Sequence, residues 1–464
     1  DAYLLKLNSK GEIDTTPPVV KIVSPKDGVE LGGIIDINID AKDNYELEKV
    51  TLYIDGKKVK EYTAGPYKYS WDSSKATEEG AHAITAEAID YSGNVGRKSI
   101  TTAIIDKIKD VSWQKTFGGE YDDKANSIQQ TTDGGYIVAG YKNGDVYILK
   151  LDSKGEVEWQ KTFGGKYSDE ANSIQQTADG GYIVAGYSSG DVYILKMNAK
   201  GDLEWQKTFG GEDYDKANAI QQTTDGGYIV AGSTYSFGSG EEDVYILKLN
   251  SKGEVEWQKT FGGKSYDVAN SIQQTTDGGY IVAGWTEEYS GSGSQDAYIL
   301  KLNEKGDLEW QKTFGGKYGD VAKAIQQTKD CRYIVAGWTW SFGSGSQDAY
   351  ILKLNEKGEV EWQKTFGGKK SDGASSLQQT TDGGYIVAGW TESSGSGGHD
   401  VYILKLNSEG QLEWQKTFGG KGEDEANSVQ QTTDGGYIVA GWTKSFDSEY
   451  KDIYILKLNS KGEI

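Results

Sequence analysis

One heptapeptide, Trp-Gln-Lys-Thr-Phe-Gly-Gly, occurs seven times, and this repetition constrains the fold more than any other feature of the sequence. The copies begin at Trp113, Trp159, Trp205, Trp257, Trp310, Trp362 and Trp414. Each repeat holds four short runs, which in the second repeat are residues 171–177, 182–186, 192–198 and 204–209. Turns such as Asp179-Gly180-Gly181 separate them and supply the positive φ angles that tight hairpins require. No run has a helical period or exceeds strand length, so the runs are predicted to be strands.

Four antiparallel strands in each of seven repeats predict an all-β fold, a seven-bladed β-propeller. We name the strands A, B, C and D in chain order. The first D strand, at Trp113, precedes any A strand, and the last repeat ends with the C strand at residues 453–459. We therefore expect the N-terminal D strand to complete the last blade and to close the ring without a free edge.

Residues 14–110 interrupt the pattern and predict a second domain, whereas residues 111–464 form the propeller. The segment opens with Asp-Thr-Thr-Pro-Pro, and its first twelve residues hold three of the four prolines. Six alternating runs predict strands at 19–24, 34–41, 49–54, 67–71, 81–90 and 97–105. That number of short strands in so few residues is typical of an immunoglobulin-like β-sandwich.

Both domains resemble parts of surface proteins of bacteria and archaea. The strings PPVVKIVSPKDG, VTLYIDGKKV, YKYSWDSS and HAITAEAIDYSGNVG resemble their immunoglobulin-like modules. The W-x-x-T-F-G-G and D-G-G-Y-I-V-A-G motifs resemble the blades of secreted prokaryotic repeat propellers, which are often fused to such modules. The resemblance covers nearly the whole chain and implies an extracellular or cell-surface location, but no particular activity.

Residues 1–13, DAYLLKLNSKGEI, form an eighth C-type strand that closely matches residues 452–464. Seven C strands already serve seven blades, so this strand is surplus. The leading interpretation is the tail of a preceding propeller in a tandem array, and any signal peptide or anchor is then expected outside residues 1–464. Exchange of the strand into a neighbouring copy is the rival, and simple redundancy is the third option. Asp1, Tyr3, Leu5 and Leu7 are the candidate assembly residues.

Loops between strands B and C carry the strongest candidates for ligand binding. Antiparallel order places the B–C and D–A loops on one face of a propeller and the A–B and C–D loops on the other. Five of the B–C loops are long and rich in glycine, serine and aromatic residues, which can stack on sugar rings or contact a protein. The candidate binding residues are Trp285, Trp338, Trp340, Trp390 and Trp442. The alternative is that these rings fold back over the blade tips. The seven repeated Trp113-type residues are expected to serve packing.

One aspartate precedes strand A in every repeat. We expect it to accept hydrogen bonds at the blade junction, and calcium ligation is the alternative. No D-x-D-x-D-G loop supports calcium, so no cofactor is predicted. Asp40, Asp43 and Asp90 of the sandwich are further weak candidates, and the C-strand aspartate is expected to cap a turn. The seven calcium candidates are Asp123, Asp169, Asp215, Asp267, Asp320, Asp372 and Asp424.

Composition excludes several classes of function. With 49 basic and 70 acidic residues, the net charge of −21 disfavours nucleic acid and anionic membranes as partners. No run approaches the ~20 apolar residues that a membrane span needs. The single cysteine, Cys331, excludes an intrachain disulfide, and the two histidines, His82 and His399, fall in different domains, which argues against a catalytic triad. Cys331-Arg332 replaces the Gly-Gly of one turn, and we expect strain there.

These observations favour a non-catalytic, structural or adhesive surface module, one unit of a tandem array or strand-linked fibre. Its expected partners are copies of itself or adjacent units of the same polypeptide, together with surface glycans or proteins. A lectin-like propeller that binds carbohydrate or protein through the aromatic loops is the alternative. A secreted enzyme, quinone-dependent or polysaccharide-degrading, is the third option, although near-perfect repetition argues against one specialised catalytic site.

Overall fold

The computed structural model describes residues 14–28, 30–31, 34–44, 46–73, 80–104, 112–165, 167–287, 295–446 and 449–464. The chain divides into two compact units, one with strands β1 to β8 and one with β9 to β36. The assembly candidates Asp1, Tyr3, Leu5 and Leu7 lie outside the described residues. Within the described part of the chain, no helix has the length and hydropathy needed to cross a bilayer.

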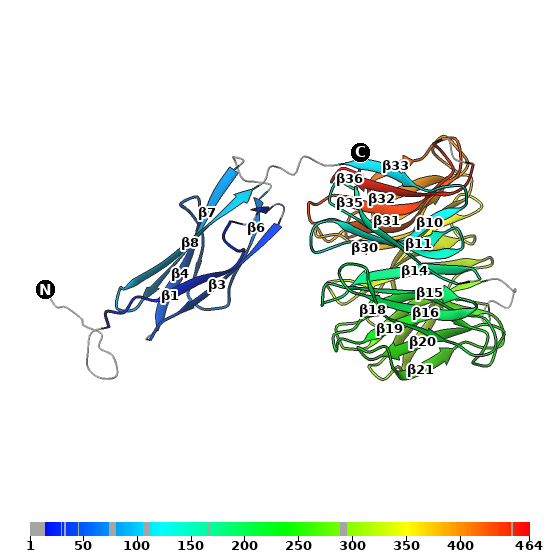
Figure 1. Cartoon of the computed structure of the whole chain (residues 1–464), viewed down its shortest axis with the longest axis horizontal. Helices are drawn as coiled ribbons and strands as arrows, with labels where there is room; N and C mark the ends of the chain where they lie inside the picture. The colour runs from blue at the N-terminus through cyan, green and yellow to red at the C-terminus, as the bar shows by residue number, and fades with distance from the viewer. Residues whose placement is uncertain are drawn as a thin grey trace. The chain divides into compact units, whose positions relative to one another are not determined.

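The first unit is a sandwich of two sheets (Figure 1). One sheet has the order β1-β3-β6 and the other the order β2-β8-β7-β4-β5. All six predicted strands are present. Strands β2 and β5 were not predicted, and β5 is a charged run that pairs with β4 across the Asp55-Gly56 hairpin. The strands are β1 (Val19–Ser24), β2 (Glu30–Leu31), β3 (Ile34–Lys42), β4 (Leu47–Ile54), β5 (Lys57–Tyr62), β6 (Tyr67–Asp72), β7 (Gly80–Asp90) and β8 (Val95–Ile104).

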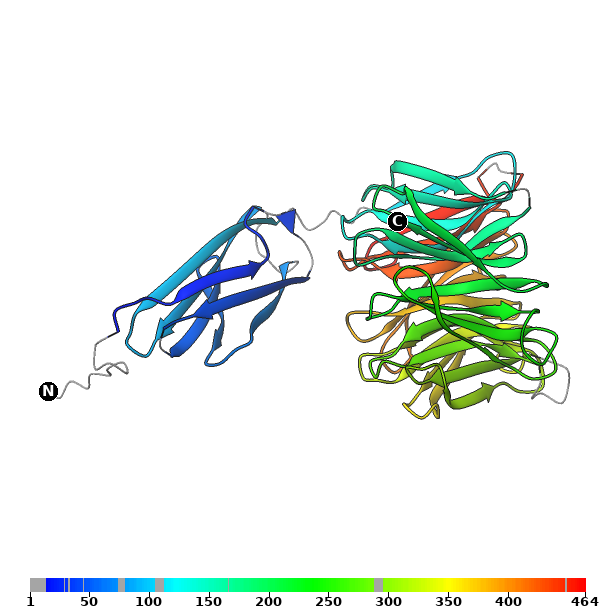
Figure 2. The ribbon, with the colours of Figure 1, turned by 60° about the horizontal axis from the view of Figure 1, so that its bottom comes forward.

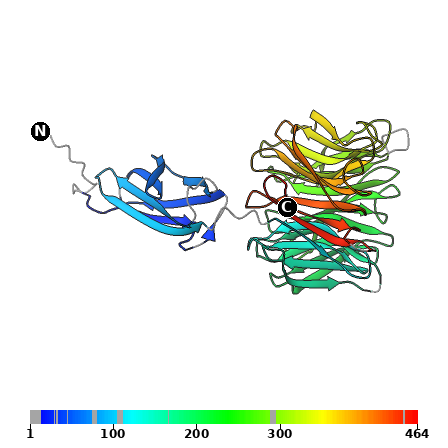
Figure 3. The same ribbon diagram turned by 90° about the horizontal axis from the view of Figure 1, so that it is seen from above.

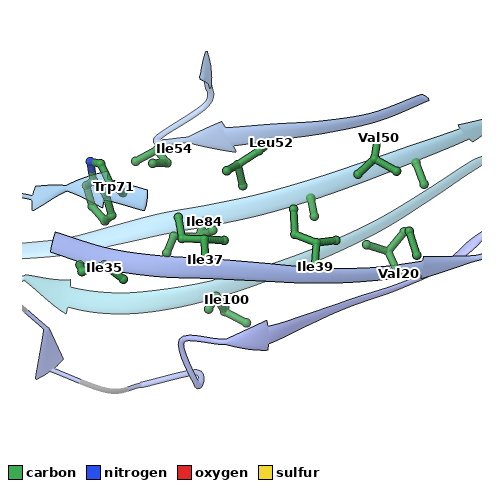
Figure 4. Packing of buried hydrophobic residues seen from close by; sticks show 13 residues of the cluster. Val20, Ile35, Ile37, Ile39, Val50, Leu52, Ile54, Trp71, Ile84 and Ile100 are labelled. Carbon is green, nitrogen blue, oxygen red and sulfur yellow. The ribbon is translucent and has the colours of Figure 1, made fainter. Parts of the chain in front are cut away.

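Alternate residues of these strands point inward and fill the space between the two sheets (Figure 4). The period of two that predicted the strands also selects the core, because successive side chains of a strand face opposite sides. Ile37 and Ile84, from opposite sheets, are fully buried at its centre. The labelled core residues are Val20, Ile35, Ile37, Ile39, Val50, Leu52, Ile54, Trp71, Ile84 and Ile100.

The second unit consists, within the described residues, of seven four-stranded antiparallel sheets. Their colours follow one another around the unit from cyan through green and yellow to red (Figure 2). The A strands are β10 (Asp123–Gln130), β14 (Asp169–Gln176), β18 (Asp215–Gln222), β22 (Asp267–Gln274), β26 (Asp320–Gln327), β30 (Asp372–Gln379) and β34 (Asp424–Gln431). The B strands are β11 (Tyr136–Lys142), β15 (Tyr182–Ser188), β19 (Tyr228–Thr234), β23 (Tyr280–Thr286), β27 (Tyr333–Thr339), β31 (Tyr385–Thr391) and β35 (Tyr437–Thr443).

The outer two strands of each sheet complete the blade. The C strands are β12 (Asp145–Leu151), β16 (Asp191–Met197), β20 (Asp243–Leu249), β24 (Asp296–Leu302), β28 (Asp348–Leu354), β32 (Asp400–Leu406) and β36 (Asp452–Leu458). The D strands are β9 (Trp113–Phe117), β13 (Val157–Phe163), β17 (Leu203–Phe209), β21 (Val255–Phe261), β25 (Leu308–Phe314), β29 (Val360–Phe366) and β33 (Leu412–Phe418). Each A strand begins two residues earlier than the sequence suggested and therefore includes the repeated aspartate.

The last sheet has the order β34-β35-β36-β9, so the predicted closure by the N-terminal D strand is confirmed. Ile453 pairs with Phe117, and Lys457 pairs with Trp113. Figure 3 shows the red strands of this sheet beside the cyan strands of the first. Closure matters because it removes the two free edges that an open arrangement of blades would expose.

Adjacent sheets pack face to face through their B and C strands. Ile137 and Ile148 of the first sheet lie in one buried cluster with Tyr182 and Leu195 of the second, and the other junctions repeat this pattern. Strands B and C are buried on both faces for this reason, which explains their continuous apolar runs. The repeated tryptophans pack as expected: Trp159 meets Tyr182 of the next blade edge to face, with ring centroids 5.9 Å apart.

Candidate ligand-binding site

Pairs of aspartates lie beneath the face formed by the D–A and B–C loops, and the A-strand member of every pair is buried. In six of the seven repeats, the first glycine of Phe-Gly-Gly lies between the C-strand aspartate of one blade and the A-strand aspartate of the next. A Cβ atom on Gly315, for example, would lie 2.1 Å from Asp296 Oδ1 and 2.7 Å from Asp320 Oδ2. A side chain does not fit there, so the chemistry of the junction requires glycine at this point.

The A-strand aspartates organise the D–A loops. Asp320 Oδ2 accepts hydrogen bonds from the Gly316 backbone N–H at 2.8 Å and from the Ser341 hydroxyl at 2.7 Å. Asp215, Asp372 and Asp424 make the same two bonds with their own glycine and serine. These hydrogen bonds account for the Oδ2 atoms of the four aspartates and leave calcium at the repeated positions a prediction.

Three of the C-strand aspartates, Asp243, Asp348 and Asp400, cap their B–C loops as predicted. Asp348 Oδ2 accepts the backbone N–H groups of Ser344 and Gly345 at 3.0 and 3.1 Å. Burial raises the pKa of Asp296, and the neighbouring charge of Asp320 raises it further. The paired carboxylates thus hold both sets of loops in place from beneath the face.

Among the five tryptophans predicted to bind a ligand, Trp340 is open to solvent, with 54% of its surface exposed. Trp285 and Trp338 are half-buried. Trp442 is only 4% exposed, and the Lys451 ammonium lies 3.4 Å above its ring centroid. The Trp442 side chain therefore packs within the protein, because the lysine covers the ring face that a ligand would need.

Trp390 is also covered on one side. His399 stacks on it with ring centroids 4.5 Å apart and an interplanar angle of 17°. The imidazole bridges Glu425, 2.8 Å from Nδ1, and Glu392, 2.9 Å from Nε2. Burial alone would lower the pKa of His399, but the two carboxylates outweigh it and raise the pKa above its ordinary value.

A second set of aromatic residues, not predicted from the sequence, lies on the same face. In the first five repeats a tyrosine follows the second glycine of Phe-Gly-Gly by two or three positions, and this spacing could have identified the set. Four of these tyrosines are between 40% and 64% exposed. The five are Tyr121, Tyr167, Tyr214, Tyr266 and Tyr318.

The larger of two aromatic clefts lies at the seam where the ring closes. Its volume is about 720 Å³, and Tyr121, Phe446 and Tyr450 supply its rings. The Tyr121 and Tyr450 centroids are 6.4 Å apart, and Glu120 and Glu449 bring carboxylates to the same cleft. One wall comes from the D–A loop after β9 and the other from the B–C loop before β36.

The second cleft lies at the junction of the second and third blades. It measures about 580 Å³ and is lined by Tyr214 and Tyr235 with the carboxylates of Asp213 and Glu241. Burial and the nearby Glu242, which accepts the Tyr235 hydroxyl at 3.2 Å, raise the pKa of Tyr235 to about 12. This tyrosine therefore stays neutral and keeps its hydroxyl proton at physiological pH.

Both clefts combine the two kinds of group that carbohydrates require. Aromatic faces stack on the apolar C–H faces of sugar rings, and carboxylates accept hydrogen bonds from hydroxyls. The candidate residues predicted from the sequence came from the B–C loops alone. The structure assembles each cleft from one D–A loop and one B–C loop.

Comparison with known proteins finds two family matches. Residues 18–86 match the model of the bacterial Ig domain, and residues 101–270 match the model described as outer membrane protein assembly factor BamB. Among curated proteins, the regulatory protein FlaEY of Caulobacter vibrioides is 24% identical over 178 residues, which are 33% of this chain. The matching segment spans only 18% of the length of that relative.

Solved propeller structures are similar at low identity. The WD40 domain of Neurospora crassa Pan2 is 12% identical, with a TM-score of 0.49 over 76% of this chain and 97% of that domain. A protein from Lactobacillus plantarum is also 12% identical, with a TM-score of 0.43 over 82% of this chain and 99% of that one. The family match and the sheet topology together establish a bacterial immunoglobulin-like domain joined to a β-propeller.

Proposed function

We propose that the chain is a non-catalytic adhesive module of an extracellular surface protein and that it binds carbohydrate on the D–A and B–C loop face. The observation that carries this proposal is the cleft at the closing seam, where three aromatic side chains and two glutamates come together. The match to a bacterial Ig domain supports a surface location, and the net charge of −21 favours neutral or basic ligands.

Binding to immobilised glycans and to polysaccharide-containing gels tests the proposal. Tyr121→Ala and Tyr450→Ala each remove one ring of the seam cleft and are expected to weaken binding about fivefold, since an aromatic contact contributes about 1 kcal/mol. Tyr167→Ala is the matched control, because Tyr167 is a D–A loop tyrosine that is 64% exposed and lines neither cleft. The proposal fails if the intact chain binds no glycan, or if Tyr121→Ala and Tyr450→Ala both bind like the wild type.

A second proposal concerns assembly of the module into an array. Each four-stranded sheet of the described propeller holds its own C strand, including β36 in the closing sheet. The C-type segment at residues 1–13 would therefore find no open position in a complete ring, which favours a strand from a preceding unit over strand exchange. Sedimentation of the intact chain is expected to give a monomer, and a dimer that is lost when the chain starts at Asp14 would favour exchange instead.

A further inference from the structure

Three carboxylates converge in the immunoglobulin-like unit from three separate parts of the chain. Asp14 precedes β1, Asp43 follows the end of β3, and Asp90 is the last residue of β7. One carboxylate oxygen of each lies within 4.8 Å of those of the other two. The pairing of Val19 with Lys42 places the start of β1 next to the end of β3, so the sheet itself brings Asp14 and Asp43 together.

Local hydrogen bonds fix this arrangement. Asp90 Oδ1 accepts the backbone N–H groups of Ser92 and Asn94 at 2.8 and 2.9 Å. The Asn94 side-chain amide donates to Asp90 Oδ2 at 2.8 Å and to the Asp14 carbonyl oxygen at 2.9 Å. These bonds hold the Asp14 backbone against Asp90, so the two carboxylates cannot separate easily.

The electrostatics of the cluster call for a positive charge. Asp14 is 5% exposed and Asp90 is fully buried. The buried Oδ2 of Asp14 accepts no hydrogen bond from the part of the chain that the structure describes. No lysine or arginine among the described residues pairs with Asp14 or Asp90. Buried carboxylates this close repel each other, and a bound cation offsets that repulsion.

We propose that Asp14, Asp43 and Asp90 bind a calcium ion. The donors are all oxygens, which suits a hard cation, and the described cluster contains no thiol or imidazole that would favour zinc. Asn44 adds a fourth donor: its side-chain nitrogen lies 3.4 Å from Asp14 Oδ1, and a 180° turn of the amide presents oxygen instead. Carbonyl groups and water complete the six to eight ligands that calcium takes. The ion would link the segment before β1 to the ends of β3 and β7.

The sequence had pointed to part of this site. It selected Asp40, Asp43 and Asp90, but Asp40 lies outside the cluster and pairs with Lys42 at 3.2 Å on the surface. Asp14 was missed because it opens a proline-rich segment that reads as a linker. Only the pairing of β1 with β3 in the structure shows that Asp14 lies beside Asp43 and Asp90.

Calorimetric titration of the chelator-treated intact chain with calcium chloride tests the site. We expect Asp14→Asn and Asp43→Asn each to lose one equivalent of bound calcium, whereas Asp40→Asn, the matched control in the same strand region, keeps it. Saturating calcium is expected to raise the melting temperature of the immunoglobulin-like unit of the wild type by about 10 °C at a hundredfold excess over Kd.

Two results would overturn the proposal. One is a wild-type chain that binds no calcium at millimolar concentration. The other is an unchanged stoichiometry and melting shift in both Asp14→Asn and Asp43→Asn. Circular dichroism establishes that each variant is folded, and Asp43, which is only half-buried, provides the informative variant if Asp14→Asn does not fold. Glycan binding by the propeller is a separate measurement, so either proposal can fail without the other.

Discussion

Gln430 of the last blade accepts the backbone N–H of Gln130 of the first blade through its side-chain Oε1, at 2.6 Å. Six more bonds of the same kind and length join the other neighbouring blades. A closed ring of glutamines therefore surrounds a central channel of about 280 Å³, which all seven A strands line. The propeller is therefore closed twice, near the channel by this ring and at the rim by the pairing of β36 with β9.

Replacement of Gln430 by alanine leaves the Gln130 N–H without its acceptor at the closing junction. We expect a loss of about 1–3 kcal/mol in the free energy of unfolding, measured by urea denaturation. Gln411→Ala is the control, because Gln411 is exposed and bonds only within its own turn, to Asn407. Equal effects of the two substitutions would show that the ring adds nothing at the closure.

Repetition made the architecture predictable. Seven copies of one pattern reported the number of sheets, the strand order and the closing strand, because each follows from counting along the chain. The clefts were harder to predict from the sequence. One forms between two loops about 330 residues apart, as with Tyr121 and Tyr450, and the other between a loop and one in the next blade. Burial of Trp442 beneath Lys451 likewise depends on a loop conformation that the sequence pattern does not report.

Gly164 and Gly165 offer a matched pair of substitutions at one blade junction. A Cβ at Gly164 would meet Asp145 Oδ1 at 2.3 Å and Asp169 Oδ2 at 2.7 Å, whereas a Cβ at Gly165 would meet nothing within 4 Å. Gly164→Ala is therefore expected to destabilise the propeller by about 1–3 kcal/mol, and Gly165→Ala by much less. Thermal unfolding monitored by near-ultraviolet circular dichroism compares them, and a similar melting temperature for both would refute the paired-aspartate account of the glycine.

His399 gives the propeller a pH-dependent contribution to stability. Its pKa is raised in the folded state, because the hydrogen bonds to Glu425 and Glu392 outweigh the effect of burial. Because the pKa of His399 is higher in the folded state, its stabilising effect is fully present at pH values below the unfolded-state pKa of about 6.5. The effect is lost as the pH rises through the folded-state pKa. We expect the stability advantage of the wild type over His399→Gln to shrink between pH 6 and pH 9 in urea unfolding.

The imidazole itself can be followed by NMR, since the chain has only two histidines. A titration midpoint for His399 above that of a model peptide supports the assignment. Loss of the pH dependence in Glu425→Gln would show that this carboxylate provides it, whereas a stability difference independent of pH would contradict the prediction.

Lys323 interrupts a second ring around the channel. At the equivalent position of five other blades an asparagine donates its side-chain amide to an alanine carbonyl of the next blade, as Asn270 does to Ala322 at 2.8 Å. Burial, together with the charge of Lys216, lowers the pKa of Lys323. Because the pKa of the lysine is lower in the folded state, its buried charge reduces the free energy of unfolding at pH values below the folded-state pKa. This reduction disappears as the pH rises towards 10.

Lys323→Asn is therefore expected to stabilise the propeller by about 1 kcal/mol at pH 7, with a smaller gain at pH 10. Ser375→Asn is the companion variant, because Ser375 is the other departure from asparagine and carries no charge. Its gain should not depend on pH. If both variants respond alike to pH in guanidinium denaturation, the charge of Lys323 is not the cause.

Cys331 and Arg332 disturb the fifth A–B turn in two separable ways. Cys331 adopts φ of +62°, where the other six repeats have glycine. The second glycine of this turn lies close to the lysine of strand C. In the second repeat, for example, a Cβ atom on Gly181 would lie 2.7 Å from Lys196 Nζ. Lys196 bonds to Glu204 at 2.9 Å, whereas the equivalent Glu361 is taken by Arg332 at 2.5 Å.

Lys353, the strand-C lysine of this blade, consequently loses its glutamate. It turns instead to the Tyr385 hydroxyl at 2.8 Å, and burial lowers its pKa, in contrast to the raised pKa of Lys196. One pair of substitutions in one turn thus propagates to a buried ammonium group.

Restoring the two glycines one at a time separates these effects. Cys331→Gly is expected to stabilise the chain by about 1 kcal/mol, since glycine adopts positive φ without strain. Arg332→Gly is expected to return Glu361 to Lys353 and raise the lysine pKa, which NMR of ¹⁵N-labelled lysine side chains can follow. A raised pKa in Cys331→Gly alone, or an unchanged one in Arg332→Gly, would show that the arginine does not control the lysine.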